Sequence, residues 1–247
     1  MAILDEAFAG IDQAIANTEK NIQNAQELFE SYLNNIFTQK GEGWKKRNLE
    51  ECAKFSGGGT PSKSRNEFWG GNIPWVSPKD MKSALITKTQ DYITNDAING
   101  SSAKLVSSGA LLIVVRSGIL ARKIPIAIAG VDLTVNQDLK VLMPISGILP
   151  EFLFFALTAQ KQVLLKKVTK GATVHRIQSD ALRNVEIGYP SLKEQEFIIN
   201  LVRSLETETD NLIVNYQDKL TALKELKQSL LQKAFAGELT SDMREAA

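Results

Sequence analysis

The sequence is poor in the two residue types that most often build reactive or metal-binding sites. Among 247 residues, Cys52 is the single cysteine and His175 the single histidine. One cysteine excludes an internal disulfide and fits a reducing compartment, so we expect a cytoplasmic protein. A Cys/His zinc site needs more ligands of these types, and any Ser-His-Asp or Cys-His nucleophile system would depend on His175. Zinc chemistry and acyl transfer are therefore not expected.

Long apolar runs and nucleotide-binding glycine patterns are also missing. No uninterrupted apolar stretch approaches the roughly 18 residues of a membrane span. The first ten residues carry Asp5 and Glu6 instead of a basic region followed by an apolar one, so no signal peptide is indicated. The three glycines at 57–59 lack the GxxxxGK[ST] pattern, and no GxGxxG occurs, so a phosphate-binding loop is not predicted.

The two ends of the chain carry the same helical pattern twice. At an offset of 198 positions, Glu27 falls on Glu225 and Phe37 on Phe235, with six further identities. Both copies keep the 4-3-4-3 apolar spacing of a coiled-coil seam. We therefore expect two helices, each about 50 Å long, that pair antiparallel. The predicted seam comprises Ile11, Ile15, Ile22, Phe29, Tyr32 and Ile36 of the first copy, and Leu212, Tyr216, Leu220, Leu223 and Leu230 of the second.

Between these helices lies an insert of different charge. Residues 44–190 hold 20 Lys and Arg against 11 Asp and Glu, whereas the flanks, 1–43 and 191–247, together hold 9 against 17. A basic insert between acidic flanks suggests one surface that meets a polyanion and another that meets a different partner. Chance segregation of solvated charges is the alternative interpretation.

Short β-rich runs between glycines and prolines predict an α+β insert. A capping box from Ser191 to Glu194, directly after Pro190, predicts the start of the C-terminal helix, with a bend near 207–209. The expected elements of the insert are strands at 49–55, 110–116, 124–129, 139–143 and 185–187, loops at 56–62 and 171–179, and a buried helix at 150–165.

The motifs of the chain, taken in order, resemble those of the DNA specificity subunits of type I restriction-modification systems. The opening signature consists of Thr-Pro-Ser at 60–62, an aromatic and glycine-rich segment at 68–75, and Lys-Asp-Met at 79–81. The resemblance covers nearly the whole chain, and the order of the motifs makes it specific. Further segments that fit the family pattern lie at 115–118, 136–138, 171–173, 190–195 and 230–239.

The resemblance implies one target-recognition domain at 44–190 between two spacer helices, at 1–43 and 191–247. It implies a non-catalytic subunit that reads one half of a bipartite site in double-stranded DNA and docks adenine methyltransferase subunits and a restriction/translocase subunit. S-adenosylmethionine and ATP would belong to those partners, so no cofactor or metal is expected here. The family has two recognition domains and this sequence one, which implies a natural half-length subunit or an engineered C-terminal half. A homodimer through the helices is a further hypothesis.

Loops of the insert supply side chains suited to phosphate and base contacts. For Asn136, Gln137 and His175, a structural hydrogen bond within the protein is the alternative, and for Arg116, which ends an apolar strand, the alternative is a solvated or paired side chain. Trp69 and Trp75 lie among glycine and proline and are expected in the core. The candidate DNA-binding residues are Lys63, Ser64, Arg65, Lys79, Lys82, Arg116, Ser117, Arg122, Lys123, Asn136, Gln137, Lys170, Thr173, His175 and Arg176.

Two other functions fit parts of the sequence. Asp132, Asp138 and Lys140 have the carboxylate, carboxylate, lysine spacing of metal-dependent nucleases, although a three-residue pattern on a strand often arises by chance. Plasmid cleavage with magnesium and without partner subunits would reveal such an activity. The second alternative is a structural coiled-coil adaptor that never touches DNA.

Overall fold

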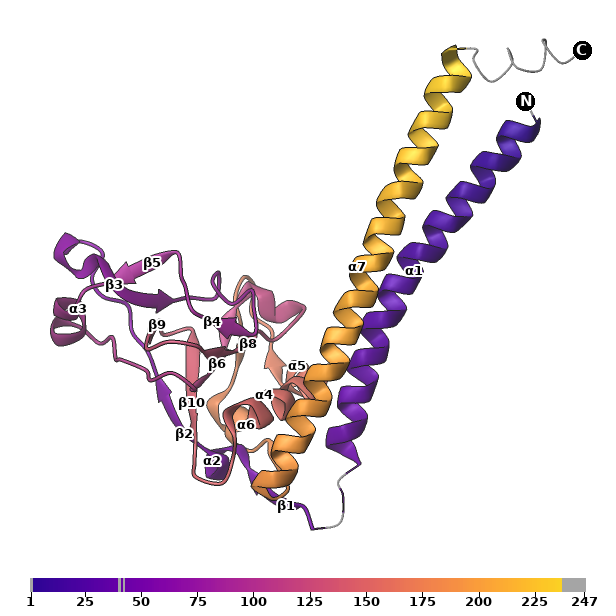
Figure 1. The fold of residues 1–247 in the computed structure, drawn as a ribbon. Helices are drawn as coiled ribbons and strands as arrows, with labels where there is room; N and C mark the ends of the chain where they lie inside the picture. The colour runs from indigo at the N-terminus through magenta and orange to yellow at the C-terminus, as the bar shows by residue number, and fades with distance from the viewer. Residues whose placement is uncertain (1, 40, 42, 237–247) are drawn as a thin grey trace, which may run out of the picture. The chain divides into compact units, whose positions relative to one another are not determined.

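The structure, a computed structural model, describes residues 2–39, 41 and 43–236 and divides into two compact units (Figure 1). The helical unit contains the described residues up to Tyr32 and those from Leu201 onward. The globular unit contains Leu33–Asn200. The segment 44–190, which the sequence sets apart, lies within the globular unit, together with short lengths of the adjoining helices.

Two long helices, α1 (Ala2–Thr38) and α7 (Leu192–Ala236), lie side by side in the helical unit (Figure 1). Lys227 forms an ion pair with Asp12, and Lys224 Nζ lies 3.6 Å from Glu19 Oε1. Residues further along α1 therefore contact residues earlier in α7, which confirms that the two helices are antiparallel. Through 207–209, α7 continues as one uninterrupted helix. None of the helices in the described part of the chain is long and apolar enough to cross a membrane.

Burial along α1 and α7 follows the predicted seam with two corrections. Tyr32 is 50% exposed while Leu33 is 3% exposed, and Leu212 is 42% exposed while Ile213 is partly buried. The seam repeat averages 3.5 residues per turn, whereas an α-helix has 3.6, so the predicted positions drift around the helix. A step of four residues in place of three corrects the drift and puts Leu33 and Ile213 in the seam. The other predicted members are buried or partly buried: Ile11, Ile15, Ile22, Phe29, Ile36, Tyr216, Leu220, Leu223 and Leu230.

A five-stranded sheet, in the order β2-β10-β6-β8-β4, forms the centre of the globular unit. Its neighbouring strands are antiparallel except β4 and β8, which are parallel. All of β6 is buried, and α4 (Pro150–Ala159) packs against β8 and β10 with Phe152 fully buried. The strands are β2 (Ala53–Gly57), β4 (Leu85–Ile86), β6 (Leu111–Val114), β8 (Ile126–Ala129) and β10 (Leu139–Pro144).

Smaller sheets complete the described part of this unit. One sheet contains β5 (Asp91–Ile93), β3 (Trp69–Val76) and β9 (Thr134–Val135) in this order. A second contains β11 (Val168–Thr169), β12 (His175–Ile177) and β7 (Arg116–Ser117). The third is the pair of β1 (Lys45–Asn48) and β13 (Glu186–Tyr189). Short helical turns are α2 (Leu49–Cys52), η1 (Asn66–Phe68), α3 (Asn95–Gly100), η2 (Gly118–Ala121), α5 (Lys161–Lys166) and α6 (Ser179–Arg183). The α+β fold class is therefore confirmed.

Some local predictions are wrong. The segment 49–55 starts as helix α2 and only then becomes β2, because Glu51 Oε2 accepts a hydrogen bond from Asn48 N at 3.0 Å and caps a helical turn. The expected loop at 171–179 contains β12, which pairs with β7 from a distant part of the sequence. The helix expected at 150–165 breaks at Gln160 into α4 and α5. The strands expected near 110–116, 124–129, 139–143 and 185–187 are confirmed as β6, β8, β10 and β13.

Aromatic side chains join the places where the chain enters and leaves the globular unit. The ring of Phe37 lies 5.3 Å from that of Phe152 and 6.4 Å from that of Trp44. Trp44 Nε1 donates a hydrogen bond of 3.0 Å to Glu194 Oε1 in the first turn of α7. Ser191 Oγ accepts from Glu194 N at 3.4 Å, as the predicted capping box requires.

Candidate nucleic-acid interface

Two tryptophans fix the glycine-rich loop at 57–62. Trp75 Nε1 donates to Gly59 O at 3.0 Å, and Trp69 Nε1 donates to Ser62 O at 3.1 Å. The two rings meet edge to face at 5.2 Å, and Trp75 is 6% exposed. Both indoles therefore lie in or against the core, as predicted, while their N–H groups position the loop backbone.

The loop also requires glycine because its backbone lies directly on other chain segments. A Cβ atom at Gly58 would lie 1.8 Å from Val135 O, and one at Gly59 would lie 2.1 Å from Ser102 Oγ. This close approach brings Thr60 to the next strand connection, where its Oγ1 donates to Gln137 Oε1 at 2.6 Å. The 57–62 loop and the 136–138 loop thus form one continuous surface.

Of the two amides in the 136–138 loop, only one faces outward. Asn136 is 5% exposed; its Oδ1 accepts from Asp138 N at 3.0 Å and its Nδ2 donates to Asp138 Oδ2 at 3.2 Å. The Asn136 side chain therefore shapes the loop, which is the alternative expected for it, and it is not available to a DNA base. Gln137 is exposed beside it.

Two arginines lie directly opposite each other on neighbouring strands. In the β7–β12 register, Arg116 pairs with Arg176, and both are exposed. Like charges across an antiparallel pair are destabilising. Asp138 offsets part of the repulsion, since its Oδ1 lies 3.5 Å from Arg116 Nε. An added anion at this position would be favourable, which suits a phosphate backbone.

Two further loops flank this arginine pair. Ser117 caps the start of η2, because its Oγ accepts a hydrogen bond of 3.4 Å from Ile119 N. Arg122 and Lys123, directly after η2, are exposed. His175 Nδ1 accepts from Gly171 N at 3.3 Å, so the histidine holds the 170–173 loop instead of standing free. A Cβ at Gly118 would lie 3.5 Å from Thr173 O, so the two loops are neighbours. Lys170 and Thr173 are exposed on the second loop.

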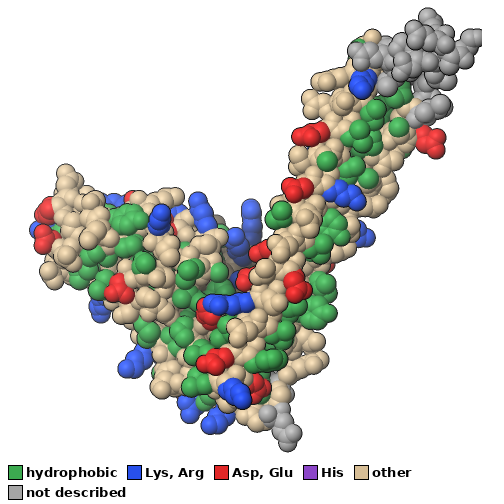
Figure 2. All heavy atoms as spheres, viewed as in Figure 1, with side chains coloured by type: hydrophobic (Ala, Val, Ile, Leu, Met, Phe, Trp, Pro, Cys, Tyr) green, Lys and Arg blue, Asp and Glu red, His purple; other side chains and the backbone are tan. Residues whose placement is uncertain are grey.

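Two of the remaining candidates, Arg65 and Lys79, already have partners within the protein. Arg65 bonds Glu67 at 2.7 Å, and its guanidinium carbon lies 4.1 Å from the centre of the Phe68 ring. Lys79 Nζ donates to Asp91 Oδ2 at 2.8 Å, and this bond raises the pKa of the ammonium group. Lys63, Ser64 and Lys82 are exposed. Figure 2 shows Lys and Arg side chains at many points of the visible face of the globular unit.

The nuclease alternative has no support in the geometry. Asp132 Oδ1 accepts from Ser108 N, before β6, whereas Asp138 O accepts from Val115 N, after β6. The two carboxylates therefore lie at opposite ends of a strand, on the order of 10 Å or more apart. Within the described residues, no cluster of three or more His, Cys, Asp or Glu is placed to hold a metal ion.

Comparison with known proteins gives one consistent result. Residues 41–232 match the type I restriction modification DNA specificity domain. The chain is 34% identical over 219 residues to the specificity subunit of the Escherichia coli type I restriction enzyme EcoR124I/EcoR124II, covering 86% of this chain and 54% of that protein. It is 30% identical over 196 residues to the MjaIX specificity subunit of Methanocaldococcus jannaschii, covering 78% and 44%.

Solved structures agree on the fold. A chain from a structure of type I restriction-modification complex assembly superposes with a TM-score of 0.80 at 21% identity, covering 95% of this chain and 57% of that chain. The HsdS subunit from Thermoanaerobacter tengcongensis superposes with a TM-score of 0.64 at 20% identity, covering 96% and 57%. The chain thus spans about half the length of the relatives it matches.

Proposed function

Because this chain belongs to the family of type I restriction-modification DNA specificity domains, we propose that its globular unit reads one half of a bipartite site in double-stranded DNA. The observation that carries the proposal is the opposed pair Arg116 and Arg176, with the exposed cations of the neighbouring loops. Lys and Arg there contact phosphates, and Gln137 is the amide that reaches base edges in the major groove.

The helical unit serves in this proposal as a spacer and docking surface. Adenine methyltransferase subunits, which use S-adenosylmethionine, and a restriction/translocase subunit, which uses ATP, bind the assembly and carry out the chemistry. The chain itself performs no catalytic step and holds no cofactor. Such an assembly acts where chromosomal DNA lies, in the cytoplasm.

Duplex binding by the full chain tests the DNA-reading part. We expect affinity to fall steeply with salt and Arg176→Ala to lose about 1 to 3 kcal/mol of binding free energy. Lys219→Ala, which removes an exposed charge from α7, is the matched control and should bind as the wild type does. Gln137→Ala should relax the sequence preference at one position. Undetectable affinity at low salt, with methyltransferase subunits present, would favour the adaptor function instead.

The sequence that is read can be found by methylation mapping. After co-expression with type I methyltransferase subunits, methylated adenines in the host DNA should share one short half-site pattern. Gln137→Ala should broaden that pattern, because a base contact is lost, whereas Arg116→Ala should lower methylation at all sites alike, because it loses a phosphate contact. Methylation without any shared pattern would contradict sequence reading by this chain.

A homodimer would supply the second recognition unit that full-length relatives have. Apolar side chains remain exposed on the helical unit, among them Leu28, Val214 and Leu226, at 56%, 52% and 48%. Two helical pairs that bury these residues would form a larger bundle. Analytical ultracentrifugation should then show a dimer at micromolar concentration, and a monomer alone would remove this part of the proposal.

A further inference from the structure

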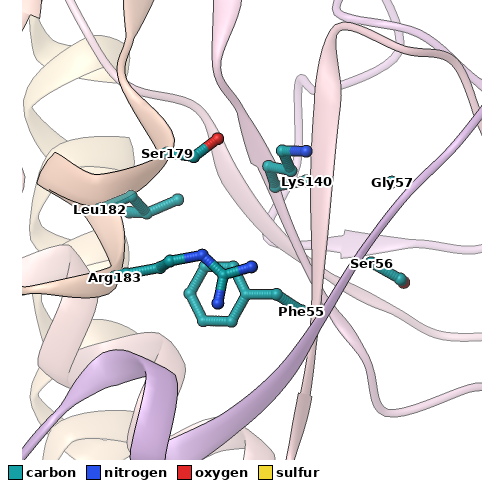
Figure 3. Close-up of a pocket in the computed structure, with 7 residues that line it drawn as sticks. All are labelled: Phe55, Ser56, Gly57, Lys140, Ser179, Leu182 and Arg183. Atoms are coloured by element: carbon teal, nitrogen blue, oxygen red, sulfur yellow. The ribbon is translucent and has the colours of Figure 1, made fainter.

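A small pocket of about 110 Å³ opens at the edge of the five-stranded sheet (Figure 3). None of the candidate DNA-binding residues lines it. Its wall is formed by Phe55 and Gly57 of β2, Lys140 of β10, and Ser179, Leu182 and Arg183 of α6.

The β2–β10 register places Lys140 at the pocket. Lys140 lies opposite Gly57, and side chains of directly opposed residues share one face of a sheet. Glycine contributes no side chain, so the space above it is left to the lysine; a Cβ at Gly57 would lie 3.6 Å from Lys140 Nζ. The strand β2 is at the edge of the sheet order, so the pocket opens beside an edge strand.

Arg183 supplies the second cation and is held on two sides. Its guanidinium carbon lies 4.8 Å from the centre of the Phe55 ring, and its Nη1 lies 3.6 Å from Glu50 Oε2. Ser179 is four residues earlier on α6, one helical turn away on the same face. Figure 3 shows the side chains of Ser179, Lys140 and Arg183 at this pocket, with the Lys140 ammonium group directed toward Gly57.

The charges of the pocket do not balance. Among the described residues, Lys140 is partly buried and makes no ion pair or hydrogen bond through its ammonium group. Glu50 faces Arg183 only, and Asp138, two residues before Lys140, is engaged by Arg116 and Asn136. An ammonium group without a counter-charge in the protein is available to a bound anion, which would form a charge-assisted hydrogen bond with it.

The donors suit a phosphate group. An ammonium, a planar guanidinium and a hydroxyl can each donate to a tetrahedral oxyanion. The apolar face that a base would stack on, the Phe55 ring, is already covered by Arg183. The pocket also adjoins the interface described above: Lys140 follows Asp138, which holds Arg116, and Ser179 follows β12, which carries Arg176.

We propose that Lys140, Arg183 and Ser179 bind one backbone phosphate of the DNA duplex and so set the orientation of the globular unit on it. This inference rests on the proposed function, since it requires that duplex DNA lies against the β7–β12 face. A phosphate contact carries no sequence information, so the pocket positions the unit without selecting bases.

The test is duplex binding by the full chain over a range of salt concentrations. Lys140→Ala should weaken binding to cognate and unrelated duplexes by the same factor, about three- to tenfold, and should reduce the slope of log K against log salt by about 0.9. Lys140→Arg should restore both. Lys54→Ala is the matched control, because Lys54 is an exposed lysine on β2, the strand next to β10, and lies on the face of the sheet opposite to that of Phe55 and Gly57. Equal thermal midpoints establish that each variant is folded.

Each other outcome points elsewhere. If the wild type binds duplex DNA and Lys140→Ala binds it with the same affinity and the same salt slope, the phosphate-binding role of the pocket is contradicted. The proposed function is then unaffected. No binding by the wild type would overturn the function itself. Loss confined to one base position would make Lys140 a base reader. If calorimetry shows inorganic phosphate bound by the wild type but not by Lys140→Ala, while duplex affinity is unchanged, the site takes a free anion and the proposal fails.

Discussion

Gln195, in the first turn of α7, is hydrogen-bonded to the backbone of Leu149 at the start of α4. Its Oε1 accepts from Leu149 N at 2.9 Å. Its Nε2 donates to Gly147 O at 2.9 Å and to Pro190 O at 3.0 Å, and the side chain is fully buried. One amide thus ties the exit of the globular unit to the loop before α4.

Gln195→Ala should destabilise the globular unit by about 2 to 4 kcal/mol, because it leaves the Leu149 N–H and the Gly147 and Pro190 carbonyls without this partner and opens a cavity in place of a fully buried side chain. Urea unfolding followed by tryptophan fluorescence measures the change, since all three tryptophans lie in this unit. Gln228→Ala, at an exposed position of the same helix, should shift stability by less than about 0.5 kcal/mol. Equal effects of the two substitutions would contradict the role of Gln195.

Gly58→Ala and Gly10→Ala should act in opposite directions. A Cβ at Gly58 meets Val135 O at 1.8 Å, so the loop backbone must move, at a cost of about 1 to 3 kcal/mol. Gly10 is within α1 and a Cβ there meets nothing within 4 Å, so alanine should stabilise the helix by about 0.5 to 1 kcal/mol. The thermal midpoints of both variants test this prediction. A Gly58→Ala protein as stable as the wild type would show that the loop backbone can move without cost.

Cys52 should be inert in the folded protein. It is fully buried, and burial raises the pKa of its thiol to about 11, with Arg47 opposing the rise. The reactive thiolate is therefore roughly one part in a thousand at pH 8. Iodoacetamide should label the protein only after unfolding in guanidinium, whereas Ser64→Cys adds an exposed thiol that should react at once. Rapid labelling of native Cys52 would mean that the core around α2 opens readily.

Glu206 on α7 should make the protein slightly less stable at neutral pH. Burial, and then the nearby Asp210 charge, raise the pKa of its carboxyl. A raised folded-state pKa gives stability that is present below the ordinary Glu pKa and is lost as pH rises through the raised value. Glu206→Gln should therefore increase stability at pH 7, by less than about 1 kcal/mol because the group is partly solvated, and should lose that advantage near pH 4.

Thermal midpoints at the two pH values provide the measurement. Glu225→Gln, which removes an exposed carboxylate from the same helix, is the control for general charge effects. If Glu206→Gln raises the midpoint equally at pH 7 and pH 4, ionisation of Glu206 is not the cause.

The helices and the central strands could be predicted from periodicity, because an element that buries one face needs apolar residues at a regular spacing in the sequence. The seam and the apolar run of β6 both follow from residue spacing alone. The errors are local as well: Tyr32 and Leu212 miss by one residue, since a 3.5-residue repeat drifts on a 3.6-residue helix. At Asn48 and Glu51, a capping signature was present but stood next to a β-rich run.

The site was harder to predict because its geometry comes from pairings distant in sequence. Arg116 and Arg176 meet only through the β7–β12 register. Asn136 and Gln137 are adjacent amides, and only the contact of β9 with β3 decides which one faces inward. Lys140 fits a nuclease pattern in the sequence, whereas its surroundings depend on the glycine opposite it on β2. A single lysine within the apolar strand expected at 139–143 is the sequence signal from which the pocket could have been found.

The pairing of β1 with β13 has a consequence for how such proteins change over time. Lys45 lies opposite Tyr189, so the segment between them begins and ends at neighbouring points of one ladder. Segments whose ends meet in this way can be exchanged as a block without stretching the chain on either side. A single recombination event that replaces the coding region between these two residues would exchange the whole segment while α1 and α7 stay the same; under the proposed function, the DNA sequence that is read would change and the proposed docking helices would not.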